Sequence, residues 1–89
     1  TMEKDPELAR EWYLKAARQG VARAQHNLGV MYAEGKGVQK DRVRAWAWFH
    51  LAAEQGSPKA SENRAALEER MDNADIKKAR DLAQKLKSR

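Results

Sequence analysis

The spacing of apolar residues divides the chain into five segments, each with the three-to-four-residue period of an amphipathic helix. Asp5-Pro6 has the residue types that open a helix, and Gly20 and Gly56 follow apolar stretches where a helix commonly ends. These signals predict helices at about 6–19, 21–34, 41–55, 58–71 and 73–87. No segment alternates between apolar and polar positions as a strand does, so the pattern predicts an all-α chain.

The sequence also repeats itself with a period of 36 residues. Aligning residues 5–31 with residues 41–67 gives nine identities in 27 positions, among them Trp12 with Trp48. A period of this length with two helices per unit is typical of a solenoid of antiparallel helix pairs. We therefore expect four segments: 1–4, a short tail or junction; 5–40, a first repeat; 41–71, a second and terminal repeat; and 72–89, a capping helix.

The repeated residues lie on one stripe of each helix at 100° per residue. A large aromatic ring among alanines lets two helix backbones approach closely while the ring fills the remaining space. We expect this stripe to form the structural core, which would comprise Trp12, Ala16, Ala24, Leu28, Gly29, Tyr32, Trp48, Ala52 and Gly56.

Residues 22–56 carry an ordered set of small, aromatic and glycine positions, namely Ala24, Leu28-Gly29, Tyr32, Gly35, Gly37-Val38, Asp41, Ala45, Trp48, Ala52-Ala53 and Gly56. This order resembles the Sel-one-like repeat, a relative of the tetratricopeptide repeat with a longer loop between units. The resemblance implies a right-handed α/α solenoid that holds other proteins or peptides on a concave face lined by the first helix of each pair. After Ala60 the sequence departs from the pattern, with Arg64, Ala65 and Glu68 in place of leucine, glycine and tyrosine. That form is similar to the last repeat of bacterial members, which leads into one extra helix.

Composition and charge exclude several classes of protein. The chain has no cysteine, which excludes disulfides, thiolate zinc sites and thiol nucleophiles. Its net charge is +5, and residues 75–89 supply +4 of it, with six basic and two acidic residues, so the basic character belongs to the last helix. No apolar run reaches the ~20 residues of a membrane span. The start at Thr1-Met2 suggests a piece of a longer bacterial protein, for which both cytoplasm and periplasm fit.

Candidate chemistry is sparse. His26 and His50 lack the His-x-x-His or His-Glu-x-x-His spacing of a metal site, and Gly35-Lys36-Gly37 is too short for a phosphate-binding loop. The sequence therefore predicts a protein that is not an enzyme and has no catalytic residues, cofactor or metal.

The function that we predict is a scaffold or adaptor that binds another protein or a peptide. Two alternatives stay open: a nucleic-acid-associated module that uses the basic last helix, and an accessory domain of a longer enzyme. Nucleic acid is the less favoured partner, because no aromatic residue for base stacking follows Phe49.

A partner-binding strip is predicted on the side of the helices opposite the core stripe. It comprises Leu14, Val43, Ala47 and His50, with Trp46 at its flank. An exposed tryptophan is a common interface anchor. The alternative is that Trp46 folds inward against the last helix, on Ile76 or Leu82.

Overall fold

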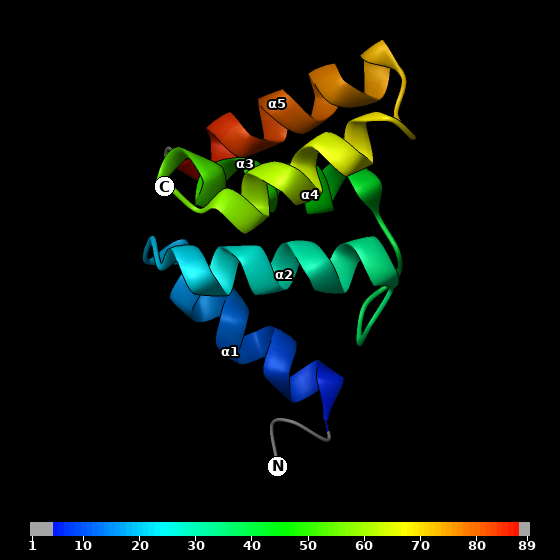
Figure 1. The fold of residues 1–89 in the computed structure, drawn as a ribbon. Coiled ribbons are helices and arrows are strands. Elements are labelled where there is room, and N and C mark those ends of the chain that lie inside the picture. The colour runs from blue at the N-terminus through cyan, green and yellow to red at the C-terminus, as the bar shows by residue number, and fades with distance from the viewer. Residues whose placement is uncertain (1–4, 88–89) are drawn as a thin grey trace.

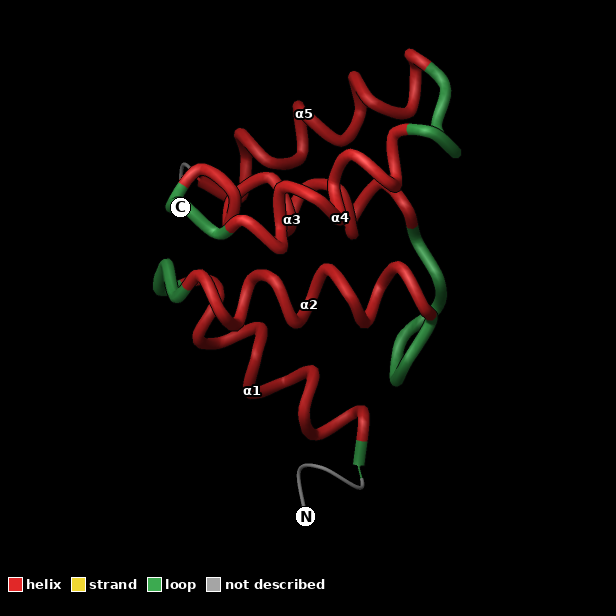
Figure 2. The backbone as a smooth tube through the Cα atoms, in the orientation of Figure 1, coloured by secondary structure: helices red, strands yellow, loops and turns green. Residues whose placement is uncertain are grey.

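The computed structural model describes residues 5–87, which form a stack of helices (Figures 1 and 2). The helices are α1 (Pro6–Arg18), α2 (Ala22–Glu34), α3 (Arg42–Glu54), α4 (Pro58–Glu68) and α5 (Asn73–Lys87). No strand occurs within these described residues, so the prediction of an all-α chain is confirmed. The predicted junction at 1–4 lies outside the described residues.

Matching residues begin and end the equivalent helices of the two repeats. Asp5 and Asp41 stand before α1 and α3, and the carboxylate of each accepts backbone N–H hydrogen bonds from the first turn at 3.1–3.2 Å. Gly20 and Gly56 end the same two helices with φ of +90° and +97°, values that L side chains rarely adopt. The 36-residue period is therefore a repetition of backbone geometry as well as of sequence.

The fourth helix ends three residues earlier than the sequence predicts. After Glu68 the chain makes a tight turn in which Arg70 N–H donates to the Leu67 carbonyl at 2.9 Å. Met71 N–H donates to the Glu68 carbonyl at 3.2 Å, and the Met71 side chain is still buried. The apolar period thus continues beyond the helix because Met71 reaches the core from the turn.

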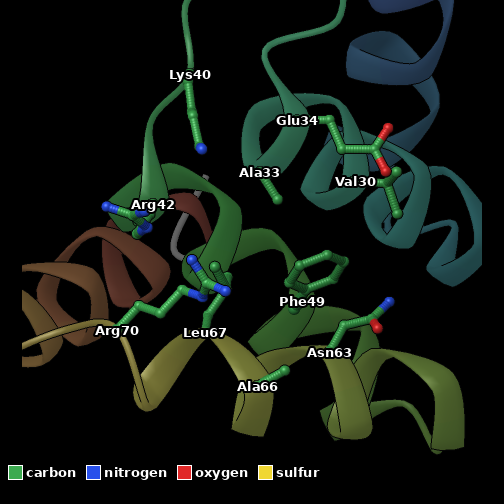
Figure 3. Close-up of a pocket in the computed structure, with 10 residues that line it drawn as sticks. All are labelled: Val30, Ala33, Glu34, Lys40, Arg42, Phe49, Asn63, Ala66, Leu67 and Arg70. Atoms are coloured by element: carbon green, nitrogen blue, oxygen red, sulfur yellow. The ribbon is translucent and has the colours of Figure 1, made fainter.

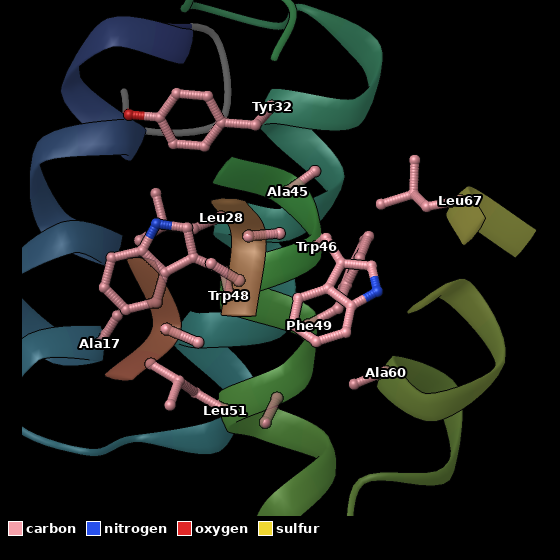
Figure 4. Close-up of a cluster of buried hydrophobic side chains, with 14 of the residues drawn as sticks. Ala17, Leu28, Tyr32, Ala45, Trp46, Trp48, Phe49, Leu51, Ala60 and Leu67 are labelled. Carbon is pink, nitrogen blue, oxygen red and sulfur yellow. The ribbon is translucent and has the colours of Figure 1, made fainter. Parts of the chain in front are cut away.

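The third helix lies at the centre of the stack. It packs against α2, α4 and α5, whereas α1 packs mainly against α2. Residues 45–49 of α3 are all buried, which is the pattern of a helix covered on several sides (Figure 4). Trp46, Phe49 and Leu28 are the largest side chains that are almost completely inaccessible.

Most of the predicted core residues lie in this cluster: Ala24, Leu28, Gly29, Tyr32, Trp48 and Ala52 are buried. Ala16 is partly buried and packs against the cluster. The prediction is wrong for Trp12, whose side chain is 56% exposed, because α1 lies at one end of the stack and packs mainly against α2 alone. It is also wrong for Gly56, which is exposed in the turn after α3 and matters there for its positive φ.

Candidate functional site

The structure does not present the predicted partner-binding strip as one surface. Trp46 is 2% exposed and Ala47 is fully buried, so neither can be an exposed anchor. The indole Nε1–H of Trp46 donates to Glu68 Oε1 at 3.3 Å, and the Arg64 guanidinium lies 5.9 Å from the ring centroid. Trp46 folds inward, as the alternative predicted, while its contact with Ile76 or Leu82 of the last helix stays a prediction. The polar partners of its ring come from α4.

His50 belongs to the same packed layer. Its ring stacks on Trp46 with centroids 4.7 Å apart and planes 10° from parallel. Arg64 Nη1 lies 2.7 Å from His50 Nδ1, and because arginine can only donate, Nδ1 must accept. Burial lowers the pKa of His50, and the nearby cations Arg64, Arg80 and Lys87 lower it further against the opposing effect of Glu54. His50 is therefore a neutral ring that joins α3 to α4.

Leu14 and Val43, the two other residues of the predicted strip, are half-buried and pack against the core cluster. With Trp46 and Ala47 covered, they are separate partly exposed side chains and do not form a continuous apolar surface. The sequence pattern placed Val43, Ala47 and His50 opposite the core stripe of α3 with Trp46 at its flank, but α4 and α5 also pack against α3.

A different surface has the form of a binding groove. It lies between α2 and α4 and has a volume of about 270 Å³ (Figure 3). Its apolar lining comes from both of these helices and from α3 beneath them, and consists of Val30, Ala33, Phe49, Ala66 and Leu67. We call it the α2–α4 groove.

A close contact between α2 and α3 lies beneath the α2–α4 groove. The Phe49 ring forms part of the lining and approaches the backbone of Gly29, where a Cβ atom would lie 2.5 Å from two ring carbons. Only glycine leaves room for the ring in this position. The His26 imidazole also packs against the ring, with centroids 5.7 Å apart and planes at 47°, and His26 Nε2 is 3.0 Å from Asn63 Nδ2 in α4.

The rim of the α2–α4 groove is charged. Lys40 and Arg42, before and at the start of α3, and Arg70, just beyond α4, supply three cations, and Glu34 supplies one anion (Figure 3). None of the three cations forms an ion pair with a carboxylate within residues 5–87. The groove therefore combines an apolar floor with a rim of net positive charge.

The basic residues of the last helix form a separate surface. Lys77, Lys78, Arg80, Lys85 and Lys87 are exposed on α5, and Arg89 lies outside the described residues. Lys87 Nζ is 3.5 Å from Glu54 Oε1, so part of this charge is paired with α3. Ala79 and Ala83, on the opposite side of α5, are buried in the core.

No group of three or more His, Asp or Glu side chains within residues 5–87 could hold a metal ion. No helix in the same range is long and apolar enough to cross a membrane.

Comparison with known proteins identifies the repeat. A family model described as Sel1 repeat matches residues 1–21 and 22–57. The chain belongs to the Sel1 repeat family. The boundary of the family model falls between α1 and α2, so its full unit of 22–57 pairs α2 with α3.

Two solved structures share the fold. The chain is 38% identical to c5321, a protective antigen of uropathogenic Escherichia coli strains with an SLR fold, with a TM-score of 0.89 over 93% of this chain and 18% of that one. It is 48% identical to a Sel1 repeat protein from Oxalobacter formigenes, with a TM-score of 0.70 over 72% of this chain and 26% of that one. The predicted fold class, an all-α solenoid of the tetratricopeptide-like kind, is confirmed.

Curated relatives come from fungi and bacteria. The chain is 43% identical over 51 residues to chitin synthase regulator SKT5 from Saccharomyces cerevisiae, covering 57% of this chain and 7% of that protein. It is 33% identical over 66 residues to alginate biosynthesis protein AlgK from Pseudomonas aeruginosa, covering 74% of this chain and 14% of that protein. The chain thus spans a small part of the curated relatives that it matches. Sel1 repeat proteins generally mediate protein–protein interactions, and the repeat is typically a non-catalytic scaffold.

Proposed function

We propose that this chain is a non-catalytic adaptor module and that the α2–α4 groove holds a segment of its protein partner. The observation that carries the proposal is the combination of an apolar floor with three rim cations that have no carboxylate partner within residues 5–87. The partner segment that fits carries an apolar side chain next to one or more acidic residues.

The size of the groove supports a side chain as the occupant. Pockets for small molecules and cofactors typically measure about 300–1,000 Å³. The α2–α4 groove, at about 270 Å³, is just below this range and is open to solvent. It suits one or two apolar side chains of an extended or helical segment, which would cover Val30, Phe49 and Leu67.

The rim supports selection by charge. Lys40, Arg42 and Arg70 outnumber Glu34, so an acidic residue beside the docked side chain meets net positive charge. Each exposed pair of this kind contributes only about 0.2–1 kcal/mol. The cations would therefore set orientation and specificity, while burial of the apolar side chain would supply most of the affinity.

The test is selection of peptides from a displayed random 12-residue library on the full chain. We expect the selected peptides to share an apolar residue flanked by Asp or Glu. Their affinity should fall about tenfold or more for Ala66→Trp, because Ala66 is an exposed residue that lines the groove and an indole there would fill it. Arg70→Glu should weaken the same peptides and shift the selection away from acidic flanks.

The matched control is Lys78→Glu, which makes the same charge change on the exposed face of α5. It should leave the affinities unchanged, and circular dichroism should show that all three variants are folded. Peptides without acidic flanks, or affinities that Ala66→Trp and Arg70→Glu do not alter, would refute the assignment of the groove.

A further inference from the structure

A second pocket opens beside the loop that joins α2 to α3, next to the first turns of α1 (Figure 1). It has a volume of about 620 Å³, and α1, the end of α2, the loop and the start of α3 all contribute to its lining. Pockets for small molecules are usually lined mainly by apolar side chains. Most of the side chains here are polar or charged, namely Arg10, Tyr32, Gln39, Lys40, Asp41 and Arg44. We call it the α1–α3 pocket, and its lining suits a charged ligand.

Positive charges outnumber negative charges in the lining of the α1–α3 pocket. Arg10, Lys40 and Arg44 supply three cations, and Asp41 supplies one anion. Both oxygens of Asp41 face Arg44, because Oδ1 accepts its backbone N–H at 3.1 Å and Oδ2 lies 3.4 Å from its Nε. Arg10 and Lys40 form no ion pair with a carboxylate within residues 5–87. The pocket therefore has two positive charges in excess, and its one carboxylate is already engaged.

Arg10 gives an independent sign that an anion belongs in this pocket. Its Nε is buried and has no hydrogen-bond partner within residues 5–87. Buried polar atoms are nearly always hydrogen-bonded, and leaving the N–H of a charged group unsatisfied is costly. An anion in the pocket would offset this cost, because its charge stabilises the guanidinium.

The opposite wall of the α1–α3 pocket is held in place by its own contacts. The Arg44 guanidinium lies 5.8 Å from the centroid of the Tyr32 ring, within the range of a cation–π contact. Its Nε faces Asp41, which leaves the edge with the two terminal nitrogens for a ligand. Asp41 N–H donates to the Tyr32 carbonyl at 2.9 Å, and Lys36 N–H donates to the Met31 carbonyl at 2.9 Å, so both ends of the loop are tied to α2. A wall fixed in advance loses less entropy when a ligand binds.

We propose that the α1–α3 pocket binds the phosphoryl group of a phosphorylated serine or threonine in a protein partner. A phosphoryl group on a side chain carries about −1.5 to −2 charges at pH 7 and three acceptor oxygens. This matches the two excess charges and the three cations, which come from α1, the loop and α3. A carboxylate carries a single charge and is satisfied by one guanidinium. The volume of about 620 Å³, against about 270 Å³ for the α2–α4 groove, leaves room for peptide backbone beside the phosphoryl group.

The experiment titrates the full chain, labelled with nitrogen-15, and follows its backbone amide resonances by NMR. The probes are three short peptides with blocked ends and glycine flanks, with phosphoserine, glutamate or serine at the centre, and sodium phosphate. We expect the phosphoserine peptide to shift the amides of residues 37–44 and to bind about tenfold or more tightly than the glutamate peptide. Inorganic phosphate should shift the same amides and bind more weakly than the phosphoserine peptide, and the serine peptide should cause no shift.

Variants of the two arginines test the site. Arg10→Gln and Arg44→Gln each remove one charge from the pocket and should weaken the phosphoserine peptide about tenfold or more. Arg10→Lys keeps the charge without the guanidinium fork and should give an intermediate affinity. The matched control is Arg18→Gln, which removes the same charge from an exposed side chain at the end of α1 and should leave the affinity unchanged. Circular dichroism should show that all four variants are folded.

Lys40 lines both the α1–α3 pocket and the α2–α4 groove, so the test does not use it. Arg70→Gln, which changes only the rim of the groove, should leave the affinity for the phosphoserine peptide unchanged. A loss equal to that of Arg10→Gln would overturn the proposal, because the peptide would then lie in the groove. The proposal is also overturned if the amides of residues 37–44 do not shift, if neither Arg10→Gln nor Arg44→Gln weakens binding, or if the glutamate peptide or inorganic phosphate binds as tightly as the phosphoserine peptide.

Discussion

Replacing Gly29 with alanine tests how closely α2 and α3 are packed. Gly29 is buried within α2, and a Cβ atom built on it lies 2.5 Å from Cδ1 and Cε1 of Phe49 and 2.9 Å from Cγ. Real Cβ atoms almost never approach within 3.0 Å, so the ring or the helix must move. The contact includes Cγ, the ring atom that is bonded to Cβ of Phe49. Rotation of the ring about the Cβ–Cγ bond does not move Cγ, so a small rotation cannot relieve the contact.

Two effects of opposite sign decide the magnitude. Alanine is favoured over glycine inside a helix by about 0.5–1 kcal/mol, which stabilises the variant. Overpacking of a close-packed core typically costs about 1–3 kcal/mol. Phe49 is 2% exposed and packs against His26, so we expect the cost of overpacking to exceed the gain from helix propensity. The net loss in the free energy of unfolding should be about 1–2 kcal/mol.

The measurement is urea unfolding followed by circular dichroism at 222 nm, for Gly29→Ala, Phe49→Leu and the double variant. Leucine at position 49 removes the ring atoms that the new methyl group meets. Gly29→Ala should therefore be neutral or stabilising in the Phe49→Leu background, which gives a coupling free energy of at least about 1 kcal/mol. If Gly29→Ala stabilises the otherwise unchanged chain, the close contact between α2 and α3 does not exist as described.

Three further predictions concern the core, the last helix and pH. Trp48→Ala should cost about 3–5 kcal/mol because the ring is buried, whereas Trp12→Ala should cost about 1 kcal/mol or less; equal losses in thermal unfolding would contradict the difference in burial. Removal of residues 73–89 should cause aggregation or loss of helicity, because α5 covers one side of α3, and a monomeric product with unchanged helicity in α1–α4 would show that α5 is dispensable. The pKa of His50 is lower in the folded than in the unfolded chain, so its contribution to stability is fully present above about pH 6.5, the ordinary pKa of histidine. This contribution is lost as pH falls through the lowered pKa of the folded chain. The free energy of unfolding in urea should therefore depend less on pH for His50→Gln than for the unchanged chain between about pH 5 and 7.

The helices and their order could be predicted from the sequence because their determinants are local. Asp5 and Asp41 accept N–H hydrogen bonds from the turn that directly follows, and Gly20 supplies a positive φ within its own turn. The end of α4 was predicted less accurately for a related reason. Met71 keeps the apolar spacing of the helix and is buried, but it contacts the core from a turn. The spacing of apolar residues indicates which residues are buried, but it does not indicate whether the backbone at those residues is helical.

The surfaces could not be predicted in the same way, because exposure depends on what lies opposite. The core stripe of α3, taken alone, predicts that Trp46 is exposed. In the structure, Glu68 and Arg64 of the α4 segment lie against its ring. The α2–α4 groove joins residues as far apart as Val30 and Arg70, with no local motif that connects them. The one sequence signal for it is Gly29, since a glycine inside a helix indicates that another group approaches closely.

Repetition in the sequence predicts the backbone geometry of a repeat well, but it does not predict how far an individual side chain is buried. Trp12 and Trp48 occupy the same position of the same helix type, one period apart, and differ from 56% to 4% in exposure. The difference arises because a solenoid buries each unit against its neighbours, so the identical residue is core in one unit and surface in the next. Equivalent positions of the two repeats therefore have the same hydrogen-bonded caps and turns. Burial is shared only where equivalent neighbouring helices cover both positions.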